Sequence, residues 1–316
     1  MILAVTLNPA LDVTHHVRHA DWDGVNRPHR VLTRPGGKGL NVARVLRTLG
    51  ADVRAIGLAG GLDGQAVREG LAAAGVPATF TPIAGLTRRT FTVVDEAAGR
   101  VAAFNEPGPA VAHGEYRRFR TLFGRALAGC SVAVLSGSVP PGVPATGYAA
   151  LTKTAAAAGV PVILDADGPA LRHALAAGPA VVKPNLAELE RAAGRQLRAG
   201  GEPDLAAVAA AARELTAAGA GAAVVSLGPR GLLAVTADGA WLAAPAARAA
   251  GNPTGAGDAV VAGLALGLSL GRSWEERLRA CAALGAAAVA APAAGDISLD
   301  DYHRELDRVE LAAIGG

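Results

Sequence analysis

Two things are scarce in this 316-residue chain: cysteine, and long uninterrupted runs of apolar residues. The two cysteines, Cys130 and Cys281, lack the paired spacing of a zinc site or a disulfide framework, so a reducing compartment is expected. The hydrophobic fraction is 51%, yet much of it is alanine, and no window reaches the roughly 18 apolar residues of a spanning helix. The segment from Met1 to Leu7 is typical of a strand rather than of a signal peptide. We therefore expect a cytoplasmic protein without a membrane partner.

Basic runs and lysines are scarce as well. The net charge is +3 and the arginines are interspersed with acidic residues, which argues against nucleic acid as the main partner. The lysines among the 30 basic residues are Lys38, Lys153 and Lys183. Compositional bias is the simple explanation. The alternative is that Lys38 and Lys183 persist where a compact ammonium is needed near phosphate groups.

Short β-branched runs alternate with alanine-rich stretches of helical periodicity, and this alternation predicts an α/β fold with a mostly parallel sheet. The expected buried strands are 2–7, 53–58, 132–135, 160–164, 180–183 and 222–227. The expected helices include 39–49, 116–127, 205–218 and 274–290. Two later strands, 232–236 and 240–243, are joined through Asp238-Gly239 and predict an antiparallel edge.

Three further segments interrupt this rhythm with strand-like alternation of apolar and polar residues. They are 11–17, 88–94 and 101–105, the last two joined by a turn near Ala98-Gly99. They do not fit into the parallel sheet, so we expect a small second sheet that serves as a lid. The prediction is one domain over 1–316 with a lid formed by approximately 10–35 and 86–109.

The most informative motif is Gly251-Asn252-Pro253-Thr254-Gly255-Ala256-Gly257-Asp258, which is followed directly by an apolar helix. Small residues let backbone N–H groups approach an anion, and a helix N-terminus adds partial positive charge. Asp258 falls in the first helical turn, where it could accept a proton from an attacking hydroxyl. The alternative is an ordinary acidic residue after a glycine-rich turn.

A second glycine cluster, Arg34-Pro35-Gly36-Gly37-Lys38-Gly39-Leu40-Asn41, also opens a helix and fits neither a Walker A loop nor G-x-G-x-x-G. It offers backbone close to a ligand at Gly37, an ammonium at Lys38 and an amide at Asn41. A solvated lysine at a helix start is the alternative. Asp12, just after the first strand, could accept from two sugar hydroxyls or merely cap a turn.

Lys183-Pro184-Asn185-Leu186-Ala187-Glu188 places Asn185 and Glu188 on one helical face, where they could hold magnesium-bound waters beside a triphosphate. A simple capping box, with Asn185 as the cap, is the competing interpretation. Ser226, Gly228 and Gly231 form a strand end and a glycine-flanked turn that could border nucleotide phosphates or only turn the chain. Ser138, after another strand, belongs to a rigid loop or to a substrate wall.

In this order the motifs resemble the PfkB/ribokinase family of carbohydrate kinases over essentially the whole chain. The resemblance lies in Gly36-Gly37-Lys38-Gly39-Leu40-Asn41, Lys183-Pro184-Asn185 with Glu188, Ser226-Leu227-Gly228 with Gly231, and Gly255-Ala256-Gly257-Asp258. The segments 6–12, 87–88 and 104–108 are similar to the branch that phosphorylates sugar phosphates, above all 1-phosphofructokinases and tagatose-6-phosphate kinases. Thr90 departs from this pattern, since relatives often have asparagine there.

The resemblance implies a ribokinase-like three-layer α/β/α sandwich with a mostly parallel sheet and a small β lid, often in a lid-mediated homodimer. It implies ATP and Mg²⁺, with K⁺ as a further candidate. Asp258 would be the base, and the backbone of Gly255, Ala256 and Gly257 the anion hole. The nucleotide would border Lys183, Asn185, Ser226, Gly228 and Gly231, with magnesium at Asn185 and Glu188. The sugar would contact Asp12, Gly37, Lys38, Asn41 and Ser138, with Lys38 and Arg88 facing its phosphate.

The leading hypothesis is therefore an ATP-dependent kinase that converts fructose 1-phosphate into fructose 1,6-bisphosphate. Tagatose 6-phosphate and fructose 6-phosphate are alternative acceptors, because the same cations could meet a phosphate at either end of the sugar. A sugar-phosphate sensor without turnover is an alternative of another class, although such a protein has no need of a base at Asp258. A dinucleotide-dependent oxidoreductase is disfavoured, because no strand is followed by the required spaced glycines.

Overall fold

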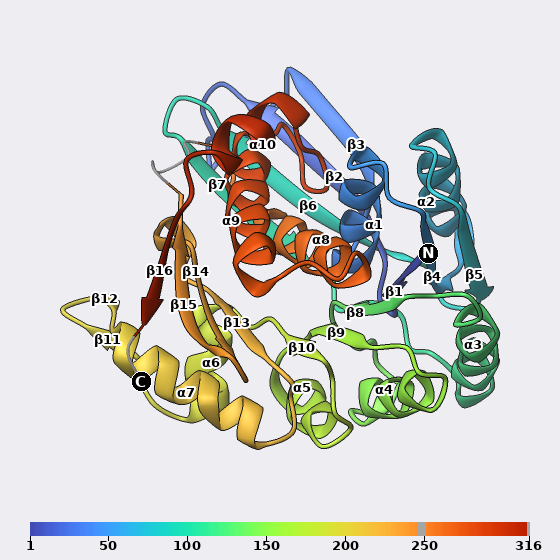
Figure 1. Ribbon diagram of the computed structural model, residues 1–316. Helices are drawn as coiled ribbons and strands as arrows, with labels where there is room; N and C mark the ends of the chain where they lie inside the picture. The colour runs from blue at the N-terminus through green and yellow to red at the C-terminus, as the bar shows by residue number, and fades with distance from the viewer. Residues whose placement is uncertain (246–250, 315–316) are drawn as a thin grey trace.

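The computed structural model describes residues 1–245 and 251–314, in which a ten-stranded sheet lies between two layers of helices (Figure 1). The strand order is β16-β15-β14-β13-β10-β9-β8-β1-β4-β5. The parallel strands are β1 (Ile2–Thr6), β4 (Val53–Ala59), β5 (Ala78–Pro82), β8 (Val132–Ser136), β9 (Val162–Asp165), β10 (Val181–Val182) and β13 (Ala223–Ser226). The antiparallel edge consists of β14 (Leu232–Thr236), β15 (Gly239–Ala244) and β16 (Glu310–Ile314). The strand β16 was not anticipated.

Both faces of the sheet are covered, so its central strands are apolar without alternation. In β1, Leu3 and Val5 belong to one buried cluster, and Ile2 and Ala4 belong to the other. The first cluster lies beneath α3 (His113–Ala126), α4 (Gly147–Ala157), α5 (Gly168–Leu175), α6 (Leu186–Ala193) and α7 (Leu205–Ala217). The second lies beneath α1 (Lys38–Thr48), α2 (Gly61–Ala73), α8 (Ala256–Ser269), α9 (Trp274–Ala290) and α10 (Leu299–Leu306).

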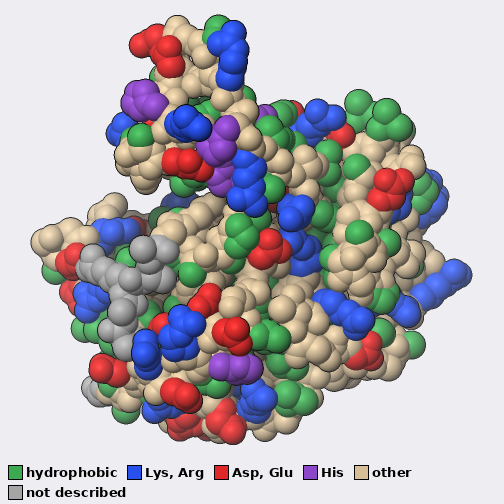
Figure 2. All heavy atoms as spheres, turned by 90° about the horizontal axis from the view of Figure 1, so that it is seen from above, with side chains coloured by type: hydrophobic (Ala, Val, Ile, Leu, Met, Phe, Trp, Pro, Cys, Tyr) green, Lys and Arg blue, Asp and Glu red, His purple; other side chains and the backbone are tan. Residues whose placement is uncertain are grey.

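A separate four-stranded sheet forms the lid, in the order β3 (Arg30–Gly36), β2 (Ala10–Val17), β6 (Arg88–Asp95) and β7 (Arg100–Asn105). The central pair β2 and β6 is parallel, and both outer pairs are antiparallel. Figure 2 shows a lobe with histidine side chains that stands out from the body beside a hollow. The predicted three-layer α/β/α sandwich with a small β lid is thereby confirmed.

Smaller elements complete the described chain: the hairpin β11 (Arg198–Ala199) and β12 (Glu202–Pro203), and a short 3-10 turn at Gly228–Arg230. No helix in the described ranges combines the length and the apolar character that crossing a bilayer would require.

Glycine lets α1 begin directly against the end of β1. A Cβ atom on Gly39 would overlap the Thr6 hydroxyl and the Val5 carbonyl oxygen, so a larger residue would push the helix away from the strand. The close approach places Lys38 and Asn41 at the carboxyl edge of the sheet, where open α/β folds bind ligands.

Candidate active site

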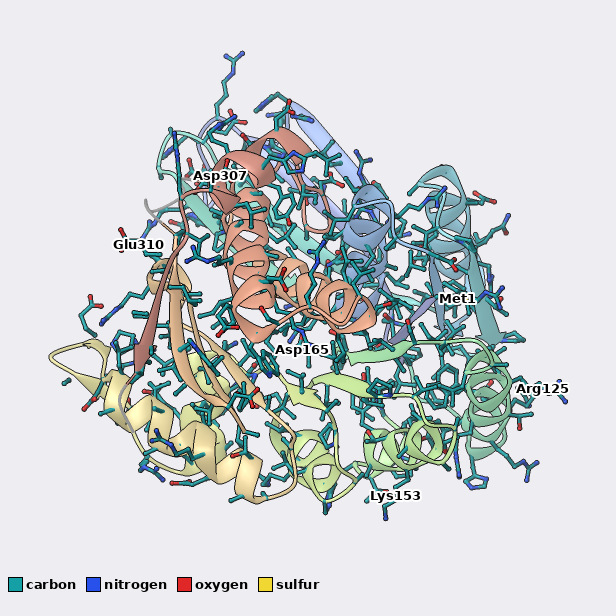
Figure 3. The ribbon with its side chains drawn as sticks, in the orientation of Figure 1. Met1, Arg125, Lys153, Asp165, Asp307 and Glu310 are labelled. Carbon is teal, nitrogen blue, oxygen red and sulfur yellow. The ribbon has the colours of Figure 1, made fainter. Side chains whose placement is uncertain are left out.

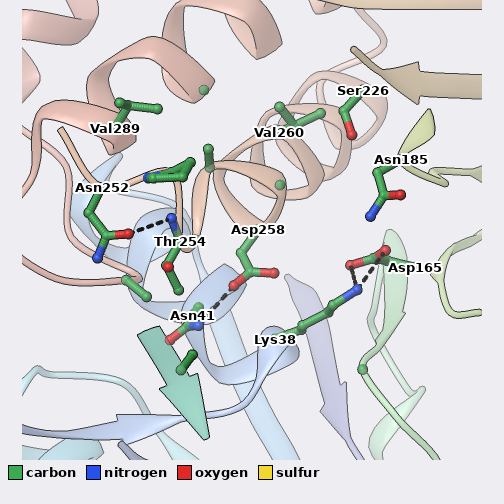
Figure 4. Close-up of a pocket in the computed structure, with 18 of the residues that line it drawn as sticks. Lys38, Asn41, Asp165, Asn185, Ser226, Asn252, Thr254, Asp258, Val260 and Val289 are labelled. Carbon is green, nitrogen blue, oxygen red and sulfur yellow. Dashed lines mark hydrogen bonds and ion pairs between the residues drawn. The ribbon is translucent and has the colours of Figure 1, made fainter. Parts of the chain in front are cut away.

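One cavity of about 1080 Å³ lies between the carboxyl edge of the sheet and the lid. Fifteen of the sixteen site residues predicted from the sequence line it, drawn from all of the motifs described above. The exception, Glu188, lies behind Lys38, with its Oε1 atom 3.7 Å from the Lys38 ammonium. In Figure 4, Asp258, Lys38, Asp165 and Asn185 come from four different elements and face a shared space.

Asp258 is buried in the first turn of α8, and its Oδ2 atom accepts a 2.8 Å hydrogen bond from the Asn41 side-chain amide (Figure 4). Burial is the main cause that raises the pKa of Asp258 to about 7, and the nearby Asp165 carboxylate adds to the rise. Lys38, Lys183 and the Asn41 hydrogen bond act in the opposite direction. Asp258 is thus a carboxyl group that can exchange a proton near neutral pH.

The start of α8 requires glycine. Gly255 is the N-cap residue with φ of 90°, and a Cβ atom there would lie 2.8 Å from the Cα atom of Ala294. The N–H of Ala256 already donates to the Pro253 carbonyl at 3.2 Å. Because the first amides of a helix have no acceptor within the helix, those of Gly257 and Asp258 are the donors left for an anion.

Asp165, which is labelled in Figure 3, lies at the end of β9. It is the centre of a charged cluster that the motifs did not identify. Its side chain is 1% exposed and forms ion pairs with the ammonium groups of Lys38, at 3.3 Å, and Lys183, at 3.4 Å. It also accepts a 3.1 Å hydrogen bond from the Ser136 hydroxyl. Burial alone would raise the pKa of Asp165, but the two lysines outweigh it and hold the pKa low. The available signal was an acidic residue directly after a predicted strand.

Lys38 is oriented by the same cluster. Burial would lower the pKa of its ammonium, but the carboxylates of Asp165 and Glu188 outweigh that effect and raise it. The side chain keeps 41% of its surface exposed and lies in the cavity wall, so a ligand can reach it. Lys38 is thus a permanently charged donor on the Asn185 side of the cavity.

The capping-box interpretation of Asn185 and Glu188 describes the start of α6 correctly. Asn185 Oδ1 accepts from the Glu188 N–H and Glu188 Oε2 accepts from the Asn185 N–H, both at 2.8 Å. Glu188 Oε1 is left facing Lys38 at 3.7 Å. The described residues contain no group of three or more histidine, cysteine or acidic side chains that could hold a metal ion unaided. A magnesium ion here would need ligands from a nucleotide and from water.

The lid supplies a carboxylate flanked by two arginines. Asp12 accepts a 2.5 Å hydrogen bond from the Thr90 hydroxyl, and burial raises its pKa while Thr90 and Arg88 oppose the rise. Arg34 lies opposite Asp12 in the β2–β3 register. Arg88 donates to the carbonyl oxygens of Asn8 at 3.3 Å and Glu106 at 3.0 Å. Across residues 1–245 and 251–314, neither arginine forms an ion pair.

Lys38 and Arg88, which were expected to face one phosphate, therefore have different neighbours: carboxylates for Lys38, and the carbonyl oxygens of Asn8 and Glu106 for Arg88. Arg34 lines the cavity and was not identified as a site residue. Asn8 was also not identified as a site residue, and its hydrogen bonds link the lid to the body of the protein. Its amide donates to the Pro107 carbonyl at 3.0 Å and to the Ser138 hydroxyl at 2.9 Å.

The other end of the cavity is more apolar. Its walls come from the strand end at Ser226, the turn at Gly228 and Gly231, and helices α8 and α9. The apolar lining residues there are Leu232, Val260, Ala282, Ala286 and Val289. An apolar slot beside glycine-rich turns suits a flat ring system attached to phosphates.

Comparison with known proteins agrees with this geometry. Residues 6–301 match the family described as "pfkB family carbohydrate kinase". The 1-phosphofructokinase of Rhodobacter capsulatus is 38% identical over 288 residues, which is 90% of each chain. The ATP-dependent 6-phosphofructokinase isozyme 2 of Mycobacterium tuberculosis is 36% identical over 313 residues, covering 99% of this chain and 90% of that protein.

Among solved structures, phosphofructokinase-2 from Escherichia coli in complex with potassium superposes with a TM-score of 0.90 and 33% identity. The alignment covers 97% of this chain and 98% of that one. The same enzyme has also been solved with fructose-6-phosphate, at a TM-score of 0.87 and with the same identity and coverage.

Proposed function

The chain belongs to the pfkB family of carbohydrate kinases, and we propose that it transfers the γ-phosphoryl group of ATP to fructose 1-phosphate, giving fructose 1,6-bisphosphate. The observation that carries the proposal is the buried Asp258 carboxyl, bonded to Asn41 at the mouth of α8 inside the cavity. Its pKa of about 7 suits a group that takes a proton from a sugar hydroxyl at neutral pH.

In the proposed reaction, the acceptor hydroxyl loses its proton to Asp258 while its oxygen bonds to the γ-phosphorus. The bond from that phosphorus to the β-phosphate bridging oxygen breaks, and ADP leaves. The amides of Gly257 and Asp258 stabilise charge on the moving phosphoryl group. Lys38 donates to the same group from the Asn185 side of the cavity. Its pairing with Asp165 favours this role over the earlier expectation that it binds the phosphate already on the sugar.

ATP enters as its magnesium complex and lies along Lys183, Asn185, Ser226 and the Gly228–Gly231 turn, with its base in the apolar slot. Magnesium keeps several waters when bound to a nucleotide, so the second oxygen of Glu188 and the Asn185 amide can reach it through water. This role is compatible with the capping box, because that box occupies only one oxygen of Glu188. Replacing K⁺ by tetramethylammonium in the assay tests whether a monovalent cation assists.

The phosphate already on the acceptor is assigned to Arg34 and Arg88. Both line the lid side of the cavity and form no ion pair in the described chain, so their charge is available for a dianion. Asp12 lies between them and is suited to the neighbouring hydroxyls. Asn41 and Ser138 would contact the remaining sugar oxygens.

A homodimer through the lid is also proposed. Val31 and Phe104 lie on the lid face turned away from the cavity and are 51% and 56% exposed. Pairing this face with a second copy would remove both side chains from water. Light scattering of the wild type and of Phe104→Ser tests the assignment, which fails if both are monomers or both are equally dimeric.

The acceptor is tested by ADP release with fructose 1-phosphate, fructose 6-phosphate, tagatose 6-phosphate and unphosphorylated fructose. The highest kcat/KM is expected with fructose 1-phosphate. A preference for one of the 6-phosphates would replace the acceptor but keep the enzyme class. Equal rates with fructose would contradict a sugar-phosphate kinase, and binding without turnover would favour the sensor alternative.

A further inference from the structure

Arg44 is a buried charge behind the cavity. It lies on α1, three residues after Asn41, and its side chain is 7% exposed. The guanidinium crosses to the turn after α9, where it donates to the Ala294 carbonyl at 2.9 Å and pairs with the Asp296 carboxylate. Burial lowers the pKa of Arg44 while Asp296 opposes the fall. A charge this deeply buried is costly unless its partners hold it in good geometry.

The turn that Arg44 holds, residues 293–296, contacts both halves of the proton-transfer site. Gly295 has φ of 78°, and a Cβ atom there would lie 3.0 Å from Asn41 Oδ1 and 2.9 Å from Arg44 Nη1. On the other side, a Cβ atom on Gly255 would lie 2.8 Å from the Ala294 Cα atom. The turn is therefore packed between α1 and Gly255, the N-cap residue of α8.

We propose that Arg44 is a positioning residue for phosphoryl transfer. By bonding the 293–296 turn to α1, it keeps Asn41 hydrogen-bonded to Asp258 and fixes the backbone at Gly255, where the anion hole begins. The proposal rests on the proposed function, because Asp258 is its point of action. Arg44 itself does not line the cavity. Its removal should therefore lower turnover more than it weakens substrate binding.

The test compares Arg44→Met and Asp296→Asn with the control Arg47→Met. Arg47 is exposed on the same helix and outside the cavity lining, so its substitution matches the chemistry without touching the turn. Misplacement of catalytic groups by a fraction of an ångström to 1 Å is expected to lower kcat about tenfold to a hundredfold in both test variants. KM for ATP should change by less than about threefold, and KM for the sugar phosphate, which Asn41 also contacts, should rise by a smaller factor than kcat falls.

The pH dependence of Asp296→Asn separates positioning from simple electrostatics. Asp258 is faced by Asp165 from β9, Lys38 from α1, Lys183 after β10 and the Asn41 amide. Loss of the Asp296 charge alone would favour the ionised form of Asp258 and move the acidic limb of kcat/KM to lower pH. Loss of the Asn41 hydrogen bond disfavours the ionised form and moves that limb to higher pH. The proposal expects the shift to higher pH.

Circular dichroism and melting curves establish that each variant is folded at the assay temperature. If Arg44→Met is not, Arg44→Lys replaces it, with an expected kcat between those of the wild type and Asp296→Asn. Three results would each overturn the proposal. They are an unchanged kcat in the folded variants, a rise in KM as large as the loss in kcat, and a shift of the acidic limb of kcat/KM to lower pH in Asp296→Asn. An inactive wild type would instead contradict the proposed function.

Discussion

Asn41 and Asp258 are 217 residues apart in sequence and share a 2.8 Å hydrogen bond between amide and carboxylate. The bond joins the glycine-rich start of α1 to the glycine-rich start of α8. It fixes one oxygen of the Asp258 carboxylate and leaves the other directed at the cavity (Figure 4). The two most informative motifs of the sequence thus form one site.

Replacing Asp258 by Asn should remove the proton acceptor and keep the shape of the site. We expect kcat to fall by several orders of magnitude, with sugar-phosphate binding retained in calorimetry. Asp300→Asn is a matched control, because Asp300 is an exposed acid in the first turn of α10. Turnover by Asp258→Asn within tenfold of the control would remove Asp258 from the mechanism.

The same substitution has a second consequence, for stability. The pKa of Asp258 rises from an ordinary value near 3.8 to about 7 on folding, so the folded state binds the proton more tightly than the unfolded state. The resulting stabilisation is complete below pH 4 and is lost as the pH rises through about 7. Asp258→Asn should therefore be more stable than the wild type at pH 8, by up to about 4 kcal/mol, and similar at pH 4. Denaturant unfolding at both pH values measures this, and a pH-independent difference would contradict the assigned pKa.

Much of the fold was predictable because its strands are short and apolar and its long helices carry clear periodicity. The lid was predictable for another reason: residues 11–17 and 88–94 alternate in polarity, so the sheet that they form must have one face exposed to solvent. The strand β16 was not predicted, because Glu310–Ile314 is largely exposed and gains its structure by pairing with β15. The helix α5 has eight residues, too few for periodicity to identify, whereas the equally short α6 was marked by its capping box at Asn185 and Glu188.

Asp165→Asn should weaken the protein and change its pH profile. The substitution leaves Lys38 and Lys183 without their shared buried carboxylate, which is expected to cost about 3–5 kcal/mol at pH 7.5. Since Asp165 raises the pKa of Asp258, its loss should move the acidic limb of kcat/KM below pH 7. Asp167→Asn, two residues away and exposed with its partner Arg191, should cost about 1 kcal/mol or less. Equal effects of the two substitutions would contradict the cluster.

The charged cluster explains why the site was only partly predictable. A motif indicates the local backbone, and residues of the glycine-rich motifs, Asp12 and the Gly228–Gly231 turn do line one cavity. The direction of a long side chain depends on partners that are distant in sequence. Lys38 meets Asp165, 127 residues later, and no local pattern reports this contact. Arg34 was missed for the same reason, since only the β2–β3 register places it beside Asp12.

Arg34→Ala and Arg88→Ala should each raise KM for the sugar phosphate about tenfold to a hundredfold, because each removes one charge-assisted contact to a dianion. KM for ATP should be unchanged, and the already low activity with unphosphorylated fructose should not fall. Arg30→Ala is the control, since Arg30 is exposed on the same strand as Arg34 and lies outside the cavity lining. An equal loss with fructose and with its phosphate would show that the arginines do not contact the phosphate.

Gly36→Ala tests the lid carboxylate without removing any polar group. A Cβ atom on Gly36 would overlap the carboxylate of Asp12, which the Thr90 hydroxyl holds in place. Backbone strain is not the cause, because Gly36 does not have a positive φ. The Asp12 side chain must therefore rotate away, and we expect KM for the sugar phosphate to rise at least about tenfold with a small change in melting temperature. Gly124→Ala in α3, where a Cβ atom would meet no neighbour, should stabilise the helix by about 0.5–1 kcal/mol without changing KM. An unchanged KM in Gly36→Ala would exclude Asp12 from acceptor binding.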